Sequence, residues 1–292
     1  MTTIRQPSPG LAPGSLHPPL SRSVAEMLDP FTTGRLAEVD IAGSSRCLVI
    51  GAGTDGIARW LAGRVGRDGA VVVIDADPGR VPAHPGVTVL RHDFTVDPLV
   101  EEHFDLIHVR SAVARPPGSR EVLAKLSMAL APGGVIGFDR LEFSANRYLL
   151  NSPDPAARRR FERFQDALGV VLAGTGIDPH GRPTHQAMCQ LGLVDVDTQV
   201  WARSWRGGEP GCLLLRTLAG ELREQLAGAG MTHREIDDCR TLLLHPGLVI
   251  RGCLAVSTIG WKRPVPSVRS GRRSGRASPM LARTGRPHPS RP

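Results

Sequence analysis

Aromatic side chains are scarce in this 292-residue sequence, where they make up 4% of all residues and include a single tyrosine. Proteins that bind single-stranded nucleic acid stack the bases on aromatic rings, so this composition argues against that class. No apolar run approaches the roughly 18 residues of a membrane-spanning helix. Residues 1–23 lack the apolar core of a secretory signal. We therefore expect a cytoplasmic protein with neither a nucleic-acid nor a membrane partner.

Cysteine is also infrequent and shows no paired spacing. The five residues form an odd number and contain no C-x-x-C pair: Cys47, Cys189, Cys212, Cys239 and Cys253. This pattern indicates neither a zinc site nor a redox couple, and we expect no metal. The thiols are expected to act as small buried hydrophobes in a reducing compartment, with a catalytic thiol as the alternative.

Acidic side chains are missing from one end of the chain. Residues 262–292 hold nine lysines or arginines and no acid, whereas the other 261 residues hold 27 basic and 28 acidic side chains. The net charge of +8 therefore belongs to the tail. We expect a Pro/Ser-rich arm at 1–22, one folded domain at 23–263 and a disordered basic tail at 264–292. The alternative for the tail is a salt-sensitive contact with an acidic partner.

The stretch "CLVIGAGTDGIARWLAG" at residues 47–63 has two different periodicities. Residues 47–50 form a continuous apolar run, typical of a strand buried on both faces of a parallel sheet. Ile57, Leu61 and Val65 then recur every four residues, which places them on one face of a helix. The segment therefore predicts a strand, a turn and a helix.

The turn itself matches G-x-G-x-x-G through Gly51, Gly53 and Gly56. Without Cβ atoms, such a turn lets a ligand lie against the backbone at a helix N-terminus. The next expected strand ends in Asp75, about 20 residues later, where related folds place an acid on a ribose hydroxyl. An adenosine-containing ligand is thus the first hypothesis, with a purely structural turn as the alternative.

Strands and helices alternate through the first half of the chain. Strands are expected at residues 46–50, 70–74, 87–91, 104–109 and 134–139. One or two short helices are expected at 23–42, and further helices at 56–65 and 119–130. This alternation predicts a parallel α/β sheet with ligands at the carboxyl ends of its strands. The second half predicts helices at 155–173, 211–227 and from a capping box at Thr232, with a late strand pair at 193–202 and 248–259.

Two cofactors compete for the glycine turn. A nicotinamide dinucleotide suits the glycine spacing, but single-domain dehydrogenases of this size usually need a tyrosine followed four residues later by lysine. The only tyrosine, Tyr148, is followed at that distance by Ser152. S-adenosylmethionine is the other candidate, and it requires an acid for the ribose and a second acid near the adenine amino group.

Both acids are present at expected strand ends. Asp75 would bind the ribose, Asp93 would accept from the adenine amine, and Phe94 would contact the ring. The alternative for Asp93 is a turn residue or a helix cap. The predicted cofactor-binding set is Gly51, Ala52, Gly53, Gly56, Asp75, Ala76, Asp93 and Phe94.

Here the sequence resembles the class I S-adenosylmethionine-dependent methyltransferases, in particular a group common in actinobacteria. The matching stretches are "RCLVIGAGTDGIARWLAGRVG", "VVVIDADP", "VTVLRHDFTVDPL", "FDLIHVR", "LAPGGVIGFD" and "STIGWKRP". The resemblance spans residues 28–264 and implies a Rossmann-like, doubly wound α/β fold. It also implies a seven-stranded, mostly parallel sheet with a reversed last strand and helical inserts over the cleft. The implied activity is methyl transfer to a small-molecule acceptor.

The sequence departs from the family pattern at three places. Val49 stands where relatives usually carry an acid, Asp55 stands where they often have a glycine, and "ARPPG" at 114–118 replaces a frequent His-Leu-Pro. The acid gained at Asp55 offers compensation for the one lost at Val49. The alternatives are a non-catalytic S-adenosylmethionine-binding relative and, less favoured, an NAD(P)-dependent oxidoreductase.

Residues on the acceptor side are less well defined. His108 and Arg110 follow the fourth strand's apolar core and are candidates, the alternative being one buried and one capping residue. Further acceptor-side candidates are more simply explained as solvated loop residues or, for the tryptophan, as an aromatic side chain at the rim: His180, Arg182, His185, Trp205 and Arg206. Because the sulfonium of the cofactor supplies the reactivity, we expect no obligatory catalytic triad. A general base is needed only if the acceptor is an unactivated hydroxyl, amine or carbon acid, and the sequence does not identify one.

Overall fold

The computed structural model describes residues 18–51, 54, 56–75, 77–93, 97–111, 120–143, 149–174 and 184–265. Its main sheet contains β1 (Arg46–Ile50), β2 (Ala70–Asp75), β3 (Val87–Arg91), β4 (Phe104–Ser111), β5 (Leu130–Glu142), β7 (Val194–Trp201) and β10 (Leu254–Trp261). The strand order is β3-β2-β1-β4-β5-β10-β7. The first five strands in this order, from β3 through β2, β1 and β4 to β5, are parallel to one another. Strand β10 is antiparallel to both of its neighbours, β5 and β7. The predicted seven-stranded sheet with a reversed strand is confirmed.

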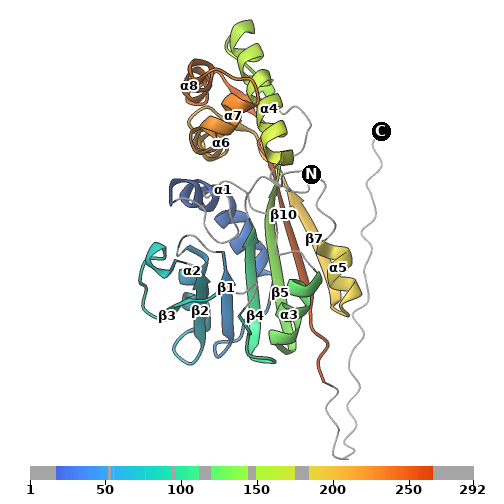
Figure 1. The fold of residues 1–292 in the computed structure, drawn as a ribbon. Helices are drawn as coiled ribbons and strands as arrows, with labels where there is room; N and C mark the ends of the chain where they lie inside the picture. Colours follow the sequence, from blue (N-terminus) through green and yellow to red (C-terminus); the bar gives the residue numbers. More distant parts are fainter. Residues whose placement is uncertain are drawn as a thin grey trace, which may run out of the picture.

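Alternate residues of the central strands enter two different cores. Cys47 and Val49 of β1 pack with α2 (Gly56–Val65) and the C-terminal part of α1 (Pro18–Ala37), whereas Leu48 and Ile50 pack with α3 (Arg120–Ala129) and α5 (Thr184–Gln190). A strand with both faces buried needs this continuous apolar run. The result is a doubly wound, three-layer α/β architecture (Figure 1).

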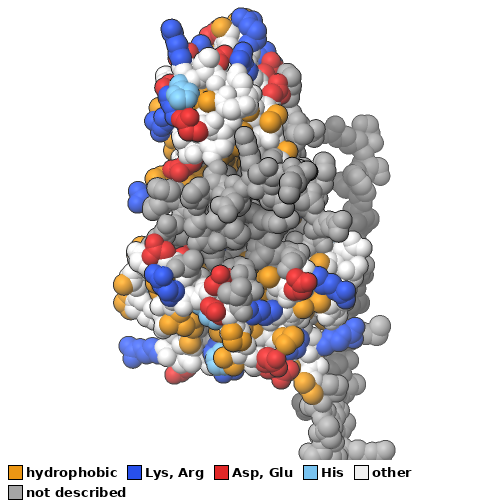
Figure 2. Space-filling model, viewed as in Figure 1, with side chains coloured by type: hydrophobic (Ala, Val, Ile, Leu, Met, Phe, Trp, Pro, Cys, Tyr) orange, Lys and Arg blue, Asp and Glu red, His pale blue; other side chains and the backbone are white. Residues whose placement is uncertain are grey.

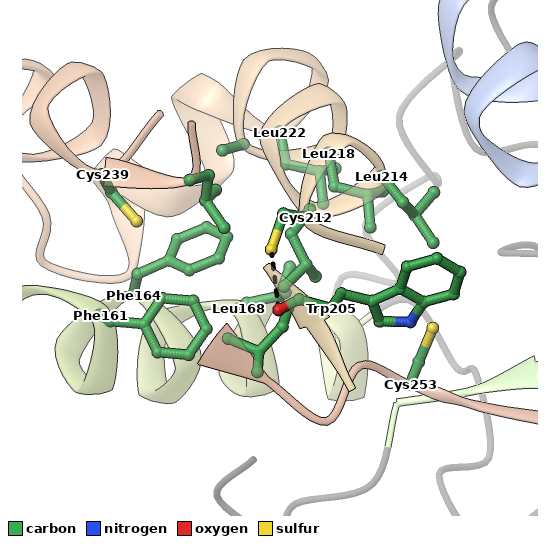
Figure 3. Packing of buried hydrophobic residues seen from close by; sticks show 14 of the residues in the cluster. Phe161, Phe164, Leu168, Trp205, Cys212, Leu214, Leu218, Leu222, Cys239 and Cys253 are labelled. Carbon is green, nitrogen blue, oxygen red and sulfur yellow. Dashed lines mark hydrogen bonds between the residues drawn. The ribbon is translucent and has the colours of Figure 1, made fainter. Parts of the chain in front are cut away.

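A helical cap stands beyond the carboxyl ends of the parallel strands (Figure 1). It consists of α4 (Pro155–Gly174), α6 (Pro210–Glu221), α7 (Arg223–Gly228), α8 (His233–Leu242) and a small sheet of β6 (Leu149–Asn151), β9 (Val249–Ile250) and β8 (Trp205–Arg206). Figure 3 shows its separate core, in which Phe161 and Phe164 of α4 face Leu218 and Cys212 of α6. This cap core is distinct from the two cores on the faces of the sheet, and it also takes in residues of α1, β5 and β10.

Helix α1 joins the cap to the sheet layer. Its first half contributes Leu20, Val24 and Leu28 to the cap core, while Leu36 belongs to the core under the sheet. Figure 1 shows α1 lying between the two bodies. Polar residues in the middle of α1 are therefore placed at the carboxyl ends of the strands.

Three expected boundaries differ from the structure. In place of the one or two short helices expected at 23–42, a single helix runs from Pro18 to Ala37, and its first half enters the cap core. The helix expected at 211–227 is two helices, separated at Leu222, whose φ of −98° and ψ of 20° are not helical. The strand expected at 248–259 is divided into β9 and β10 at Gly252, which has a φ of +78°. The capping box at Thr232 is confirmed.

The surface of the described residues mixes both charges. On the face shown in Figure 2, basic and acidic side chains intermingle over the cap and over the sheet layer. None of the helices within the described ranges combines the length and hydropathy that a bilayer crossing requires. A short 3₁₀ helix, Pro78–Arg80, lies between β2 and β3 in the sequence.

Candidate functional site

The candidate site lies along one row of residues at the carboxyl edge of the sheet. The register of β2, β1 and β4 places Gly51, just after β1, between Asp75 and Arg110. The row continues through Asp139 of β5 and Ser257 of β10. Residues level with one another in a sheet project to the same face. Two carboxylates, a guanidinium and a hydroxyl therefore gather on the face that α1 and α2 cover.

Gly51 and Gly56 allow side chains and backbone to approach closely in this region. Gly51 has a φ of +70°, and a Cβ there would lie 2.4 Å from the carbonyl oxygen of Arg110. A Cβ on Gly56 would lie 2.2 Å from Oδ2 of Asp29. Real Cβ atoms do not come so close. At Gly51 the contact is with backbone, so the packing requires a glycine there, whereas at Gly56 the contact is with the end of a side chain that can move. Their presence alone does not identify a ligand.

The two predicted adenosine-binding acids have different surroundings. Asp75 is 6% exposed, and its Oδ1 accepts a hydrogen bond from the backbone N–H of Asp77 over 2.8 Å. Asp93 is exposed, and its backbone exchanges hydrogen bonds with Asp97 in a local turn. Asp75 thus lies in the row beside Gly51, whereas Asp93 stands beyond the edge strand β3. The structure places both at strand ends and leaves their role in binding a proposal.

Several predicted residues lie outside the described part of the chain. They are Ala52, Gly53, Asp55, Ala76, Phe94, the segment 114–118, Tyr148, His180 and Arg182. Their assignments stay predictions.

A buried polar network lies beneath α1, next to Gly51. Nε2 of His108 is 3.0 Å from Oδ2 of Asp139, and the hydroxyl of Thr32 donates to the same oxygen over 2.5 Å. Nη2 of Arg110 donates to the Thr32 hydroxyl over 3.2 Å. Both members of the His108–Asp139 pair are at most 2% exposed. The network fastens α1 to the ends of β4 and β5.

Opposing effects act on the pKa of Asp139. Complete burial raises it, but hydrogen bonds and charge from His108, with further hydrogen bonds from Ser257 and Thr32, lower it more and bring the pKa to about 2. Hydrogen bonds donated to a carboxylate favour its charged form. Asp139 is therefore an ionised carboxylate inside the protein.

Arg110 also pairs with a second carboxylate. Its Nη2 lies 2.7 Å from Oδ1 of Asp29 on α1, and its side chain is 2% exposed against 27% for Asp29. His108 and Arg110, both predicted on the acceptor side, are thus buried and bonded to protein groups. The place of both residues on the acceptor side stays a prediction.

Sequence reasoning missed Asp29, Thr32 and Asp139. Asp139 ends an expected strand just as Asp75 does, and this parallel was an available signal. Asp29 and Thr32 are three residues apart and so share one face of α1. Nothing local indicates that this face meets strands that follow about a hundred residues later.

The other acceptor-side candidates have structural partners. Trp205 is 4% exposed inside the cap, and the guanidinium of Arg203 lies 4.6 Å from its ring centroid. The backbone N–H of Arg206 donates to Glu209, and Nδ1 of His185 is 3.0 Å from the hydroxyl of Thr198. These contacts favour structural roles for the described members of that set.

A pocket of about 230 Å³ opens at the opposite, amino-terminal edge of the sheet, lined among others by Asp40, Asp105, Gly133 and Trp261. It is separate from the row beside Gly51. Within the described residues, no group of three or more His, Cys, Asp or Glu side chains has an arrangement that could hold a metal ion.

No family model matches the sequence. The chain is 28% identical to Methyltransferase str3 of Strobilurus tenacellus over 173 residues, which span 56% of each chain. Among solved structures, the YcgJ protein of Bacillus subtilis has a TM-score of 0.51 at 14% identity, covering 80% of this chain and 98% of its own. Phosphoethanolamine N-methyltransferase 2 of Haemonchus contortus, solved with S-adenosyl-L-methionine, reaches 0.49 at 11% identity, covering 90% and 60%.

The likeness to YcgJ shows the fold, and the sequence similarity is to a methyltransferase. With the strand order and the reversed β10, the fold is the Rossmann-like fold of class I S-adenosylmethionine-dependent methyltransferases. The chain spans just over half the length of the curated relative that it matches.

Proposed function

We propose that this protein is an S-adenosylmethionine-dependent methyltransferase of the cytoplasm that acts on a small-molecule acceptor. The observation that carries the proposal is the row Asp75–Gly51–Arg110 at the carboxyl edge of a methyltransferase-type sheet. Ligands of open α/β sheets bind at this edge, where the strand order reverses. The reversal here lies between β1, which leads into Gly51, and β4, its neighbour in the sheet.

The residues in the row fit an adenosine-containing ligand. Asp75 is the acid next to the glycine turn and would accept hydrogen bonds from the ribose hydroxyls. Asp93 would accept from the adenine amino group, with Gly51, Gly56, Ala52, Gly53, Ala76 and Phe94 providing backbone and ring contacts. A bound S-adenosylmethionine supplies an activated methyl group, so the protein has to orient an acceptor and exclude water.

The cap supports the choice of a small acceptor. Helices α4, α6, α7 and α8 stand beyond the carboxyl ends of the parallel strands and would enclose a reacting molecule. The described surface also shows mixed charges on the visible face rather than the basic stripe expected of a nucleic-acid reader (Figure 2). We propose that the folded domain ends at 263/264, whereas its expected start at residue 23 is too late, because α1 begins at Pro18 and Leu20 lies in the cap core.

Calorimetric titration tests the cofactor assignment. S-adenosylhomocysteine should bind far more tightly than NAD, and Asp75→Asn should weaken it about 10- to 100-fold because a charged acceptor is lost. The asparagine retains an oxygen for the N–H of Asp77. Asp68→Asn is the matched control, since Asp68 is exposed before the opposite end of the same strand.

Two results would contradict the proposal. Preferential binding of NAD, together with a nicotinamide absorbance change, would indicate an oxidoreductase. Binding of S-adenosylmethionine without turnover on a panel of phenols, amines and carboxylic acids would indicate a non-catalytic relative.

A further inference from the structure

The pocket of about 230 Å³ at the amino-terminal edge of the sheet lies beside an irregularity in β5. The pairing of β4 with β5 shifts register between Phe104 and Leu106, so that residues 131–134 of β5 stand opposite Asp105 alone. Extra residues in one strand bend it and interrupt the ladder. The pocket lies between this bend and the segment 38–45, which joins α1 to β1.

The charged side chains that line the pocket are both acidic. Among the described residues they are Asp40 and Asp105, and no lysine, arginine or histidine joins them. Oδ2 of Asp105 accepts a hydrogen bond from the backbone N–H of Arg46 over 2.8 Å, while Oδ1 has no hydrogen-bond partner in the described part of the chain. A hollow lined by one sign of charge attracts the opposite sign. The pocket therefore favours a cation.

Ser45 and Trp261 add a hydroxyl and an aromatic ring to the lining. Ser45 is 7% exposed, and its hydroxyl has no hydrogen-bond partner within the described ranges. A buried polar group without a partner costs free energy, which a bound donor would recover. Guanidinium groups lie over the rings of Trp60 and Trp205, but none from the described residues lies over that of Trp261. Its indole is thus available to a cation.

We propose that this pocket binds a guanidinium group, an inference that does not depend on the proposed function. Asp105 and Asp40 supply the charge, the hydroxyl of Ser45 accepts a hydrogen bond, and the indole of Trp261 stacks on the planar cation. A guanidinium suits this set better than an ammonium, because it is planar, forms paired hydrogen bonds with carboxylates and is more weakly hydrated.

The size of the pocket agrees with a single small group. Pockets that enclose a whole drug-sized ligand have volumes of roughly 300–1,000 Å³. At about 230 Å³ this one is smaller, so it fits the end of one side chain or a small organic cation. The guanidinium comes either from this chain or from a free guanidine compound.

The chain itself carries guanidinium groups past the rim of the pocket. The backbone N–H of Lys262 donates to Gly134 over 2.8 Å, and its carbonyl accepts from Gly133 over 3.1 Å. Both glycines line the pocket. Arg269 follows Pro264 by five residues and lies outside the described part of the chain. An extended chain spans about 3.5 Å per residue, so Arg269 is no more than about 18 Å from Pro264. Tethering over so short a span gives an effective concentration on the order of millimolar.

Nuclear magnetic resonance of the full chain tests the site. The protein has four tryptophans, hence four indole N–H signals, and Trp261→Phe identifies the one at the pocket. Ethylguanidine should shift this signal, and ethylamine should bind at least about 10-fold more weakly. Asp105→Asn keeps an oxygen for the N–H of Arg46 and should weaken ethylguanidine about 10-fold. Asp68→Asn is the matched control, because Asp68 is exposed at the same edge of the sheet and does not line the pocket.

A full-length variant with glutamine in place of every arginine of residues 266–292 distinguishes the two sources. If these arginines occupy the pocket, the Trp261 signal differs between variant and wild type before any addition, and ethylguanidine binds the variant more tightly. If the natural ligand is a free compound, the signal and the affinity are the same in both proteins. Either result, with the loss in Asp105→Asn, supports the site.

Three results would overturn the inference. The first is a Trp261 signal that ethylguanidine moves in neither the wild type nor the arginine-free variant. The second is equal affinity of Asp105→Asn and Asp68→Asn for ethylguanidine, because the carboxylate in the pocket then has no part in binding. The third is equal affinity for ethylamine and ethylguanidine, because the site then selects charge and not the guanidinium plane. None of these results bears on the binding of S-adenosylmethionine at the opposite edge of the sheet.

Discussion

His108 and Asp139 form a buried pair, with 3.0 Å between Nε2 and Oδ2, at the point where α1 meets the sheet. The two residues come from adjacent strands, and Thr32 of α1 donates to the same carboxylate oxygen. A buried carboxylate such as Asp139 is left without compensation when the groups that donate to it are removed. This pair therefore links the stability of the fold to the position of α1, which also carries Asp29.

Replacing Asp139 tests that link. Asp139→Asn should lower the free energy of unfolding by about 3 kcal/mol at pH 7, since charged hydrogen bonds are lost in a buried place. Urea titration followed by circular dichroism measures the change. Asp68→Asn, at an exposed site, serves as the control and should stay within about 0.5 kcal/mol of the wild type.

The pH dependence of that difference has a definite sign. The pKa of Asp139 is lowered from 3.8 to about 2 in the folded protein. A carboxyl group whose pKa is lower in the folded state than in the unfolded state stabilises the fold. This contribution is complete at pH values above the unfolded-state pKa and is lost as the pH falls through the folded-state pKa. The gap between wild type and Asp139→Asn should thus change little just above about pH 5 and shrink between about pH 5 and pH 2. A gap that widens on acidification would falsify this assignment.

Two glycine-to-alanine substitutions distinguish a glycine that the backbone conformation requires from one that only lowers helix propensity. Gly51→Ala combines a φ of +70° with a Cβ 2.4 Å from the carbonyl oxygen of Arg110, and should destabilise by at least about 2 kcal/mol. Gly63→Ala is the control, because Gly63 lies within α2 with open space around it. It should stabilise by about 0.5 to 1 kcal/mol. Equal effects in thermal unfolding would show that the close approach at Gly51 is mistaken.

Thiol titration tests the packing of the cap core and of the core that α1 and α2 form with the sheet. Burial raises the pKa of Cys47, Cys212, Cys239 and Cys253 to about 12, whereas Cys189 is exposed. Thiolates are the reactive species, so a disulfide reagent at pH 8 should modify Cys189 quickly and the four others only on unfolding. The Cys189→Ser variant should show almost no fast phase. A second rapidly reacting thiol would mean that one of the cores is open.

Local patterns in the sequence were sufficient for the central elements. The expected helix at 56–65 and strands at 46–50 and 87–91 have the bounds of α2, β1 and β3. Their apolar periodicity is decided within a few residues, since both burial and backbone geometry follow from it. The division at Gly252 was missed because it depends on the indole of Trp205, to which a Cβ at Gly252 would come within 2.7 Å.

The sequence by itself determined the order of strands and helices, the glycine turn and the position of Asp75 at a strand end, because each depends on neighbouring residues. The tertiary structure alone decided that Asp29 and Thr32 of α1 meet Arg110 and Asp139 at the carboxyl edge of the sheet. These contacts join segments that are far apart in the chain. Their pairing depends on how α1 packs between the cap core and the core that α2 forms with the sheet. No local pattern encodes that placement.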